Sequence, residues 1–220
     1  GDIKMKVRFV NPGKLYLQLK DELDQAYFEV MTKGDLIDRG QLKSFEQNLA
    51  NFVGTKYAVG LNSGYDALHM SLRAAGIGPG DEVIVPAHTF VASCSAIVNV
   101  GATPMLVDVT KDFNIDVDKI EEVITAKTKG IMPVHLSGYM ADMPRIMEIS
   151  DKYNLLVVED ACQSLGSSID GKMAGSWGLT GCWSFYPFKI LGGYGDGGAI
   201  FPNNDELANP LRSIRAQGRS

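Results

Sequence analysis

The feature that most constrains the fold is the alternation of short β-type runs with longer helical patterns from about Lys56 onward. This alternation is typical of βαβ units, in which helices join parallel strands. Strand cores such as Val83-Ile84-Val85 and Leu156-Val157-Val158 are apolar at consecutive positions, as expected of strands that helices cover on both faces. The pattern therefore predicts an α/β fold with a mainly parallel seven-stranded sheet and helices on both faces.

The predicted elements divide the chain into two parts. Strands are expected at Tyr57–Leu61, Glu82–Pro86, Thr103–Asp108, Gly130–Val134, Leu155–Asp160, Gly181–Phe185 and Ala199–Phe201. Between the first five, helical patterns occupy Tyr65–Ala75, Ala92–Val100, Val117–Ile124 and Met143–Tyr153. Residues 1–55 are predicted to be a helical segment, with helices at Leu15–Thr32 and Gln41–Phe52, that packs on the large domain or on a partner subunit. Residues 56–220 are predicted to form that large domain.

Composition excludes several classes of function. A net charge of -5 argues against nucleic-acid binding, which needs a clustered positive surface. No apolar run approaches the ~20 residues that span a bilayer, so no membrane partner is expected. Cys94, Cys162 and Cys182 lie far apart, which indicates neither a disulfide framework nor a zinc site but reduced thiols in a cytoplasmic protein. The three histidines are equally scattered, so no metal is expected.

Ligands of an open parallel sheet bind outside the carboxyl ends of its strands, and the first predicted strand ends at Asn62-Ser63-Gly64-Tyr65. Ser63 and Asp66 have the spacing of a capping box. Free N–H groups at such a helix start attract a phosphate group. The turn is a candidate phosphate site, and a plain helix cap without a ligand is the alternative.

A second candidate is Asp160, which follows Glu159 at the end of a buried strand. A buried carboxylate needs a cation or several hydrogen-bond donors, and a protonated pyridine nitrogen is one suitable partner. A metal-binding acid and an ordinary helix N-cap are the alternatives. No Gly-x-x-x-x-Gly-Lys-Ser/Thr loop is present, which removes most of the nucleotide-triphosphatase interpretation.

The third candidate is Lys189, in the apolar stretch Phe185–Leu191 before the glycine run Gly195–Gly198. Apolar surroundings partly desolvate a lysine and favour the neutral amine that forms Schiff bases. The alternative is a surface lysine before a flexible hairpin. A phosphate-type turn, an acid at a strand end and a lysine in an apolar loop, in this order, together describe a pyridoxal phosphate site.

These residues resemble the DegT/DnrJ/StrS family of pyridoxal-phosphate-dependent sugar aminotransferases, from near Gly34 to the end of the chain. The shared motifs, in the family's order, are Asn62-Ser63-Gly64, Pro86-Ala87-His88-Thr89-Phe90, Gly101-Ala102-Thr103-Pro104, Glu159-Asp160-Ala161-Cys162-Gln163, Ser184-Phe185-Tyr186-Pro187-Phe188-Lys189 and Gly195-Asp196-Gly197-Gly198. The resemblance implies the large domain of a fold type I pyridoxal-phosphate-dependent transferase.

The resemblance also implies roles for individual residues. Lys189 corresponds to the Schiff-base lysine and Asp160 to the partner of the pyridine nitrogen. Ser184 and the backbone at Ser63, Gly64 and Tyr65 correspond to phosphate ligands, although Tyr65 stands where the family usually has threonine. Phe90 corresponds to the aromatic residue that stacks on the cofactor ring, and Gln163 to the residue beside its 3-hydroxyl.

The implied reaction transfers an amino group from an amino acid, usually glutamate, to a nucleotide-linked keto-deoxy sugar, with C3 favoured over C4. Relatives that remove a sugar hydroxyl carry histidine at the position of Lys189, so the lysine favours amino transfer. The family is dimeric with shared active sites, which implies a homodimer, and its C-terminal small domain is expected to be absent. A related cyclitol aminotransferase, a non-catalytic cofactor-binding or interaction remnant, and a sugar-nucleotide-binding module without a Schiff base are the alternatives.

Overall fold

The structure, a computed structural model, describes residues 9–219. The chain divides into two compact units, Gly1–Phe45 and Glu46–Ser220. The first contains α1 (Pro12–Lys33) and the start of α2 (Gly40–Val53). α1 begins where Asn11 Oδ1 accepts the Lys14 N–H at 3.2 Å, and none of its side chains is buried. Both helices lie where the sequence predicted them, and the packing of residues 1–55 on another surface stays a prediction.

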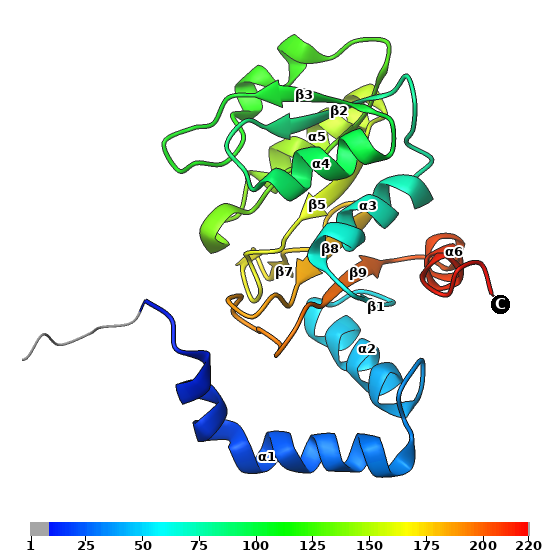
Figure 1. Cartoon of the computed structure of the whole chain (residues 1–220). Helices are drawn as coiled ribbons and strands as arrows, with labels where there is room; N and C mark the ends of the chain where they lie inside the picture. The colour runs from blue at the N-terminus through cyan, green and yellow to red at the C-terminus, as the bar shows by residue number, and fades with distance from the viewer. Residues whose placement is uncertain (1–8, 220) are drawn as a thin grey trace, which may run out of the picture. The chain divides into compact units, whose positions relative to one another are not determined.

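The second unit is built on a seven-stranded sheet in the order β1-β9-β8-β5-β4-β2-β3 (Figure 1). Four neighbouring pairs are parallel, while β9 runs antiparallel to both β1 and β8. The strands are β1 (Val59–Leu61), β2 (Glu82–Pro86), β3 (Thr103–Val107), β4 (Thr128–Ile131), β5 (Leu156–Asp160), β8 (Thr180–Ser184) and β9 (Gly198–Pro202). The predicted α/β class and mainly parallel sheet are confirmed.

The helices follow the predicted pattern with one exception. Helices α3 (Gly64–Ala74), α4 (Val91–Asn99) and α5 (Met143–Tyr153) lie where helices were predicted, and α6 (Asp205–Arg215) follows the last strand. The helix predicted at Val117–Ile124 is wrong, because the chain forms two 3₁₀ turns there, Val117–Lys119 and Glu121–Val123. Ile124 has already returned to extended backbone, so the segment is too short for a cooperative α-helix. A small hairpin, β6 (Ser168–Ile169) with β7 (Lys172–Met173), was not predicted.

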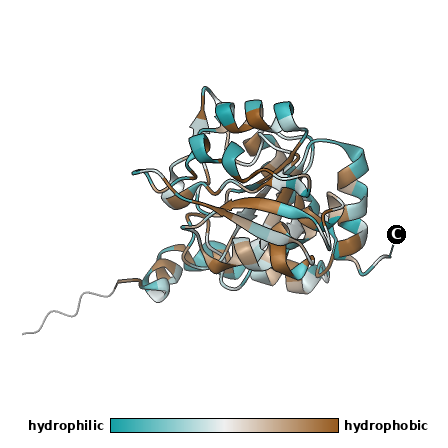
Figure 2. Ribbon diagram, turned by 90° about the horizontal axis from the view of Figure 1, so that it is seen from above, coloured by the Kyte–Doolittle hydropathy of each residue, from teal (hydrophilic) through white to brown (hydrophobic). Residues whose placement is uncertain are grey.

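Helices cover both faces of the sheet because successive strand residues point to opposite sides. On one face, Val83 and Val85 of β2 pack in a cluster with residues of α3, α4 and α6. On the other, Ile84 packs with residues of α5, and Trp183 of β8 packs with the end of α2. Figure 2 shows hydrophobic strands running between helices in which hydrophobic and hydrophilic residues are mixed. None of the helices in the described part of the chain has the length and apolar character needed to cross a bilayer.

The outer edge of β1 is occupied by two charged side chains. Glu46 accepts the Gly60 N–H at 2.7 Å, and Arg215 donates to the Gly60 carbonyl at 3.3 Å. Glu46 and Arg215 also form an ion pair with each other. They satisfy backbone groups that an open edge strand would otherwise offer to another strand.

We expect Glu46→Ala to lower the free energy of unfolding by about 3 kcal/mol, since Gly60 loses its acceptor and Arg215 loses its carboxylate. Asp118→Ala is the matched control, because it removes the exposed partner of Arg145 and should change little. Urea unfolding measures both variants. If the two substitutions lowered the free energy of unfolding equally, Glu46 would not stabilise the outer edge of β1.

Candidate functional site

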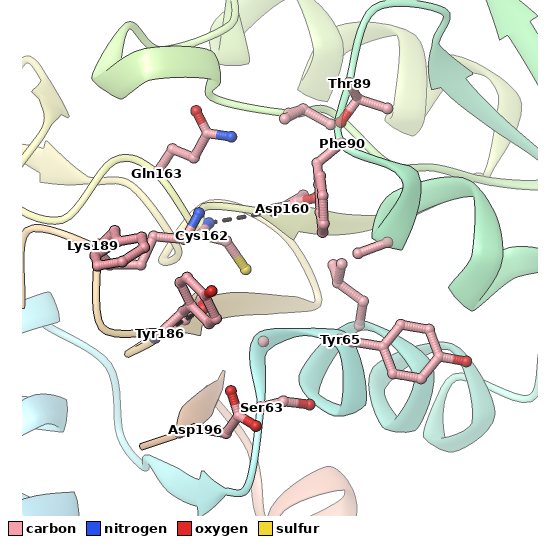
Figure 3. A pocket seen from close by; sticks show the side chains of 17 residues that line it. Ser63, Tyr65, Thr89, Phe90, Asp160, Cys162, Gln163, Tyr186, Lys189 and Asp196 are labelled. Atoms are coloured by element: carbon pink, nitrogen blue, oxygen red, sulfur yellow. Dashed lines mark hydrogen bonds between the residues drawn. The ribbon is translucent and has the colours of Figure 1, made fainter. Parts of the chain in front are cut away.

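The predicted site residues gather around one pocket of about 460 Å³ at the carboxyl ends of the parallel strands. Figure 3 shows Asp160, Gln163 and Lys189 around this cavity, with Ser63 at its other end. Of the predicted residues, the pocket is lined by Ser63, Gly64, Tyr65, Phe90, Asp160, Gln163, Ser184 and Lys189. The fold therefore brings together segments that lie more than a hundred residues apart in sequence.

The turn from β1 into α3 presents open backbone donors to the pocket. Ser63 is the N-cap of α3, and its Oγ accepts the Asp66 N–H at 3.0 Å. Within residues 9–219, the N–H groups of Gly64 and Tyr65 have no acceptor. They point out of the helix N-terminus, where the helix dipole favours an anion.

Glycine is required at position 64 because β8 passes directly beside the turn. A Cβ at Gly64 would lie 2.6 Å from Ser184 Cβ and 2.9 Å from Cys162 Sγ. Ser184 Oγ accepts the Tyr186 N–H at 3.3 Å, which leaves its hydroxyl hydrogen available to a ligand. Ser184 and the open N–H groups thus form one group of donors.

Asp160 is 6% exposed at the end of β5 and accepts hydrogen bonds from Ser93 and Cys162. Its Oδ2 accepts from Ser93 Oγ at 2.7 Å, and its Oδ1 accepts the Cys162 N–H at 3.3 Å. Each carboxylate oxygen can accept one further hydrogen bond. A positively charged N–H group in the pocket would be a suitable partner for this buried acid.

Lys189 lies in the loop after β8, where its N–H donates to the Tyr186 carbonyl at 2.8 Å. Its side chain is partly buried and lines the same pocket as Asp160. The predicted apolar surroundings are only partly present in the single chain. Phe185 is buried, but Phe188 and Ile190 are 57% and 70% exposed, because the loop lies on the surface rather than in the core.

Gln163 and Phe90 complete the wall of the pocket. Gln163 Oε1 accepts the Ser137 N–H at 2.9 Å, so the amide nitrogen is left for a ligand. Ser137 has a φ of 54°, which is uncommon for a residue other than glycine. Phe90, at the start of α4, is 66% exposed and offers a ring to the cavity (Figure 3).

The side chain of Tyr65 has partners outside the site. Its hydroxyl accepts from Asn99 Nδ2 at 2.5 Å, and its ring stacks on His69. Figure 3 shows the ring turned away from Ser63. Tyr65 therefore offers its backbone N–H to the pocket rather than a side-chain hydroxyl.

Several lining residues were not predicted as functional: Thr89, Cys162, Tyr186 and Asp196. Ser93, buried behind the pocket, was also missed although it bonds to Asp160. The available signal was the spacing of Thr89 and Ser93, because hydroxyls four residues apart at a helix start can meet. The adjacent acid Glu159 points away from the pocket and bonds to His135 and three backbone N–H groups.

Burial raises the pKa of the Cys182 thiol, and the hydrogen bond between this thiol and Ser71 partly offsets the effect. The unfolded chain therefore loses this proton near pH 9, while the folded chain keeps it. We expect the free energy of unfolding to fall above pH 9, with this thiol contributing about 1.4 kcal/mol per pH unit. Cys182→Ala should remove the contribution, so the stability difference between parent and variant should shrink from pH 8 to pH 10. If this stability difference stays constant between pH 8 and pH 10, the pKa of the Cys182 thiol is not raised by folding.

Comparison with known proteins identifies the relatives of this chain. The model of the DegT/DnrJ/EryC1/StrS aminotransferase family matches residues 18–220. A pleiotropic regulatory protein of Geobacillus stearothermophilus is 44% identical over 97% of this chain and 58% of its own length. A dTDP-3-amino-3,4,6-trideoxy-alpha-D-glucose transaminase of Streptomyces venezuelae is 42% identical over 97% of this chain and 56% of its own length.

A solved structure agrees with this relationship. DesV of S. venezuelae, in complex with a ketimine intermediate, superimposes with a TM-score of 0.94 at 42% identity, over 97% of this chain and 58% of that one. The chain thus spans a little over half the length of these relatives. With a family match over nearly the whole chain, it belongs to the DegT/DnrJ/EryC1/StrS aminotransferase family.

Proposed function

We propose that this protein is a pyridoxal-phosphate-dependent aminotransferase that moves an amino group from glutamate to a nucleotide-linked keto-deoxy sugar. The observation that carries the proposal is the shared pocket of Lys189, Asp160 and the open N-terminus of α3. These groups are an amine, a buried acid and a set of anion donors, which match the aldehyde, the ring nitrogen and the phosphate of the cofactor.

The residues present fit pyridoxal phosphate. The N–H groups of Gly64 and Tyr65, with the Ser184 hydroxyl, would hold the phosphate. Asp196 lines the pocket near Ser63 (Figure 3), so the donors have to outweigh the repulsion from its carboxylate. When bound, the cofactor supplies an aldehyde that takes up an amino group and a ring that draws electrons from the reacting carbon.

Four side chains would bind and orient the ring or act on the substrate. Asp160 would accept a hydrogen bond from the ring nitrogen and favour its protonated form. Phe90 would cover one face of the ring, and the Gln163 amide would donate to its 3-hydroxyl. Lys189 would hold the aldehyde carbon through Nζ and, once released, move a proton to and from the substrate carbon.

We further propose amination at C3 rather than C4. The Streptomyces relative is named for a 3-amino sugar, and the motifs around His88, His135 and Ser184 resemble those of C3 enzymes. A cyclitol aminotransferase would use the same cofactor-binding residues, so the identity of the aminated product distinguishes it from a sugar aminotransferase. Free Cys94, Cys162 and Cys182 support a cytoplasmic location, where thiols stay reduced.

A homodimer with shared active sites is part of the proposal. Tyr186, Phe188 and Ile190, beside Lys189, are 47%, 57% and 70% exposed. Exposed apolar groups next to a pocket indicate a surface that another chain covers. Burying them would also complete the apolar surroundings expected for Lys189.

The test is to incubate the purified protein with pyridoxal phosphate, glutamate and a dTDP-linked 3-keto-6-deoxyhexose. We expect 2-oxoglutarate and an amino sugar whose nitrogen NMR places at C3; a C4 amine would overturn the regiochemistry alone. Borohydride should fix the cofactor to Lys189, which intact mass detects. Fixation without amino transfer to keto sugars or cyclitol precursors would show a cofactor-binding remnant instead, and no fixation would overturn the proposal.

A further inference from the structure

We infer that Ser93, oriented by Thr89, is a positioning residue for Asp160. The inference rests on the proposed function, because it concerns the acid that would meet the cofactor ring. Ser93 lies in the first turn of α4 and is fully buried. Its Oγ is 2.7 Å from Asp160 Oδ2 and 2.8 Å from Thr89 Oγ1.

The direction of these two hydrogen bonds follows from the charge on Asp160. An ionised carboxylate can only accept, so the single hydrogen of Ser93 goes to Asp160. Thr89 must then donate to Ser93, because Ser93 has no second hydrogen. The order Thr89 to Ser93 to Asp160 is the arrangement that stabilises the charged acid.

The same order defines what Thr89 offers to the pocket. Thr89 lines the cavity, and its hydroxyl hydrogen is committed to Ser93, so this hydroxyl can take part in a further hydrogen bond only as an acceptor. A bound molecule that reaches this hydroxyl would therefore need to offer it a hydroxyl or amino donor.

Ser93 is the side chain that fixes the orientation of the acid. The Asp160 carboxylate also accepts the backbone N–H of Cys162, at the longer distance of 3.3 Å. Without the Ser93 hydroxyl, Oδ2 would lose its donor in a buried place, and the carboxylate could turn about its last bond. Preorganised groups of this kind matter because reorganisation during the reaction slows it.

The experiment compares Ser93→Ala, Ser93→Thr and Thr89→Val with Ser95→Ala, a control on the same helix. We expect Ser93→Ala to keep borohydride fixation at Lys189 and the KM for the keto sugar within about threefold, but to lower kcat about 10- to 100-fold. Ser93→Thr, which keeps the hydroxyl, should restore most of kcat. Thr89→Val should give a smaller loss of kcat and a raised KM, because a ligand acceptor is also removed.

The outcomes separate the inference from the proposed function. A parent protein that borohydride does not label overturns both. If the parent is labelled and active, a Ser93→Ala kcat within twofold of the parent overturns the inference alone. The same holds if Ser93→Thr fails to recover activity, or if Ser95→Ala has the same effect as Ser93→Ala. Urea unfolding of each variant checks that the fold is retained.

Discussion

Replacing Lys189 with alanine is expected to lower the rate of amino transfer at least about 10³-fold, because the variant loses both the covalent attachment and the proton carrier. No other lysine lines the pocket among the described residues, so no neighbouring amine is placed to substitute. The measurement is kcat with glutamate and the keto sugar, together with intact mass after borohydride. The fixed-cofactor mass should be absent from the variant.

Two further variants test whether the amine of Lys189 is needed rather than its positive charge, and whether replacing any lysine would have the same effect. Lys189→Arg keeps a positive charge but offers no neutral amine at neutral pH, so it should be as inactive as Lys189→Ala. Lys172→Ala is the matched control, since Lys172 lies over the Trp177 ring outside the pocket. Activity of Lys189→Ala within tenfold of the parent would remove Lys189 from the reaction.

The sheet could be predicted because its signals are local. Apolar runs such as Val83–Val85 and Leu156–Val158 can be buried only between two layers of helices, and the structure places them there. The helix predicted at Val117–Ile124 was wrong because its structure depends on more than local signals. Its apolar residues pack against the sheet, but the chain turns back before an α-helix can form, and the sequence pattern does not show that turn.

The residues of the candidate site could be predicted from the ends of the strands, but the contacts of their side chains could not. Ser63 and Lys189 each follow a strand and Asp160 ends one, and parallel strands bring such residues to one edge. The Tyr65 side chain could not be placed, because its partners Asn99 and His69 lie on α4 and on the next turn of α3. Such contacts depend on how helices pack, which the spacing of residues does not define.

The exposed loop after β8 shows another limit of sequence reasoning. A run of apolar residues predicts burial, yet Phe188 and Ile190 lie on the surface of the single chain. Apolar character alone does not tell whether residues pack within their own chain or against another one. The proposed homodimer would resolve the difference by burying these residues against a second copy.

Glu159→Ala is expected to lower the free energy of unfolding by at least about 4 kcal/mol. The carboxylate is fully buried and accepts the N–H groups of Gly175, Trp177 and Gly178 at 2.6 to 2.8 Å. It also accepts from His135 Nε2 at 3.1 Å, while the other ring nitrogen, Nδ1, accepts the backbone N–H of Ala141. Without Glu159, these four donors lose their acceptor, and those of Gly175 and His135 are buried.

The matched comparison is between adjacent acids of one strand. Successive residues of β5 point to opposite sides, so Glu159 supports the segment 175–178, whereas Asp160 faces the pocket. Asp160→Asn should therefore abolish most amino transfer with a smaller loss of stability. Glu159→Gln keeps the size but loses acceptors, so an intermediate loss of about 2 kcal/mol is expected. Urea unfolding without added cofactor measures stability alone, because a bound ligand would add its own contribution. Equal stability losses for Glu159→Ala and Asp160→Asn would contradict the division of roles.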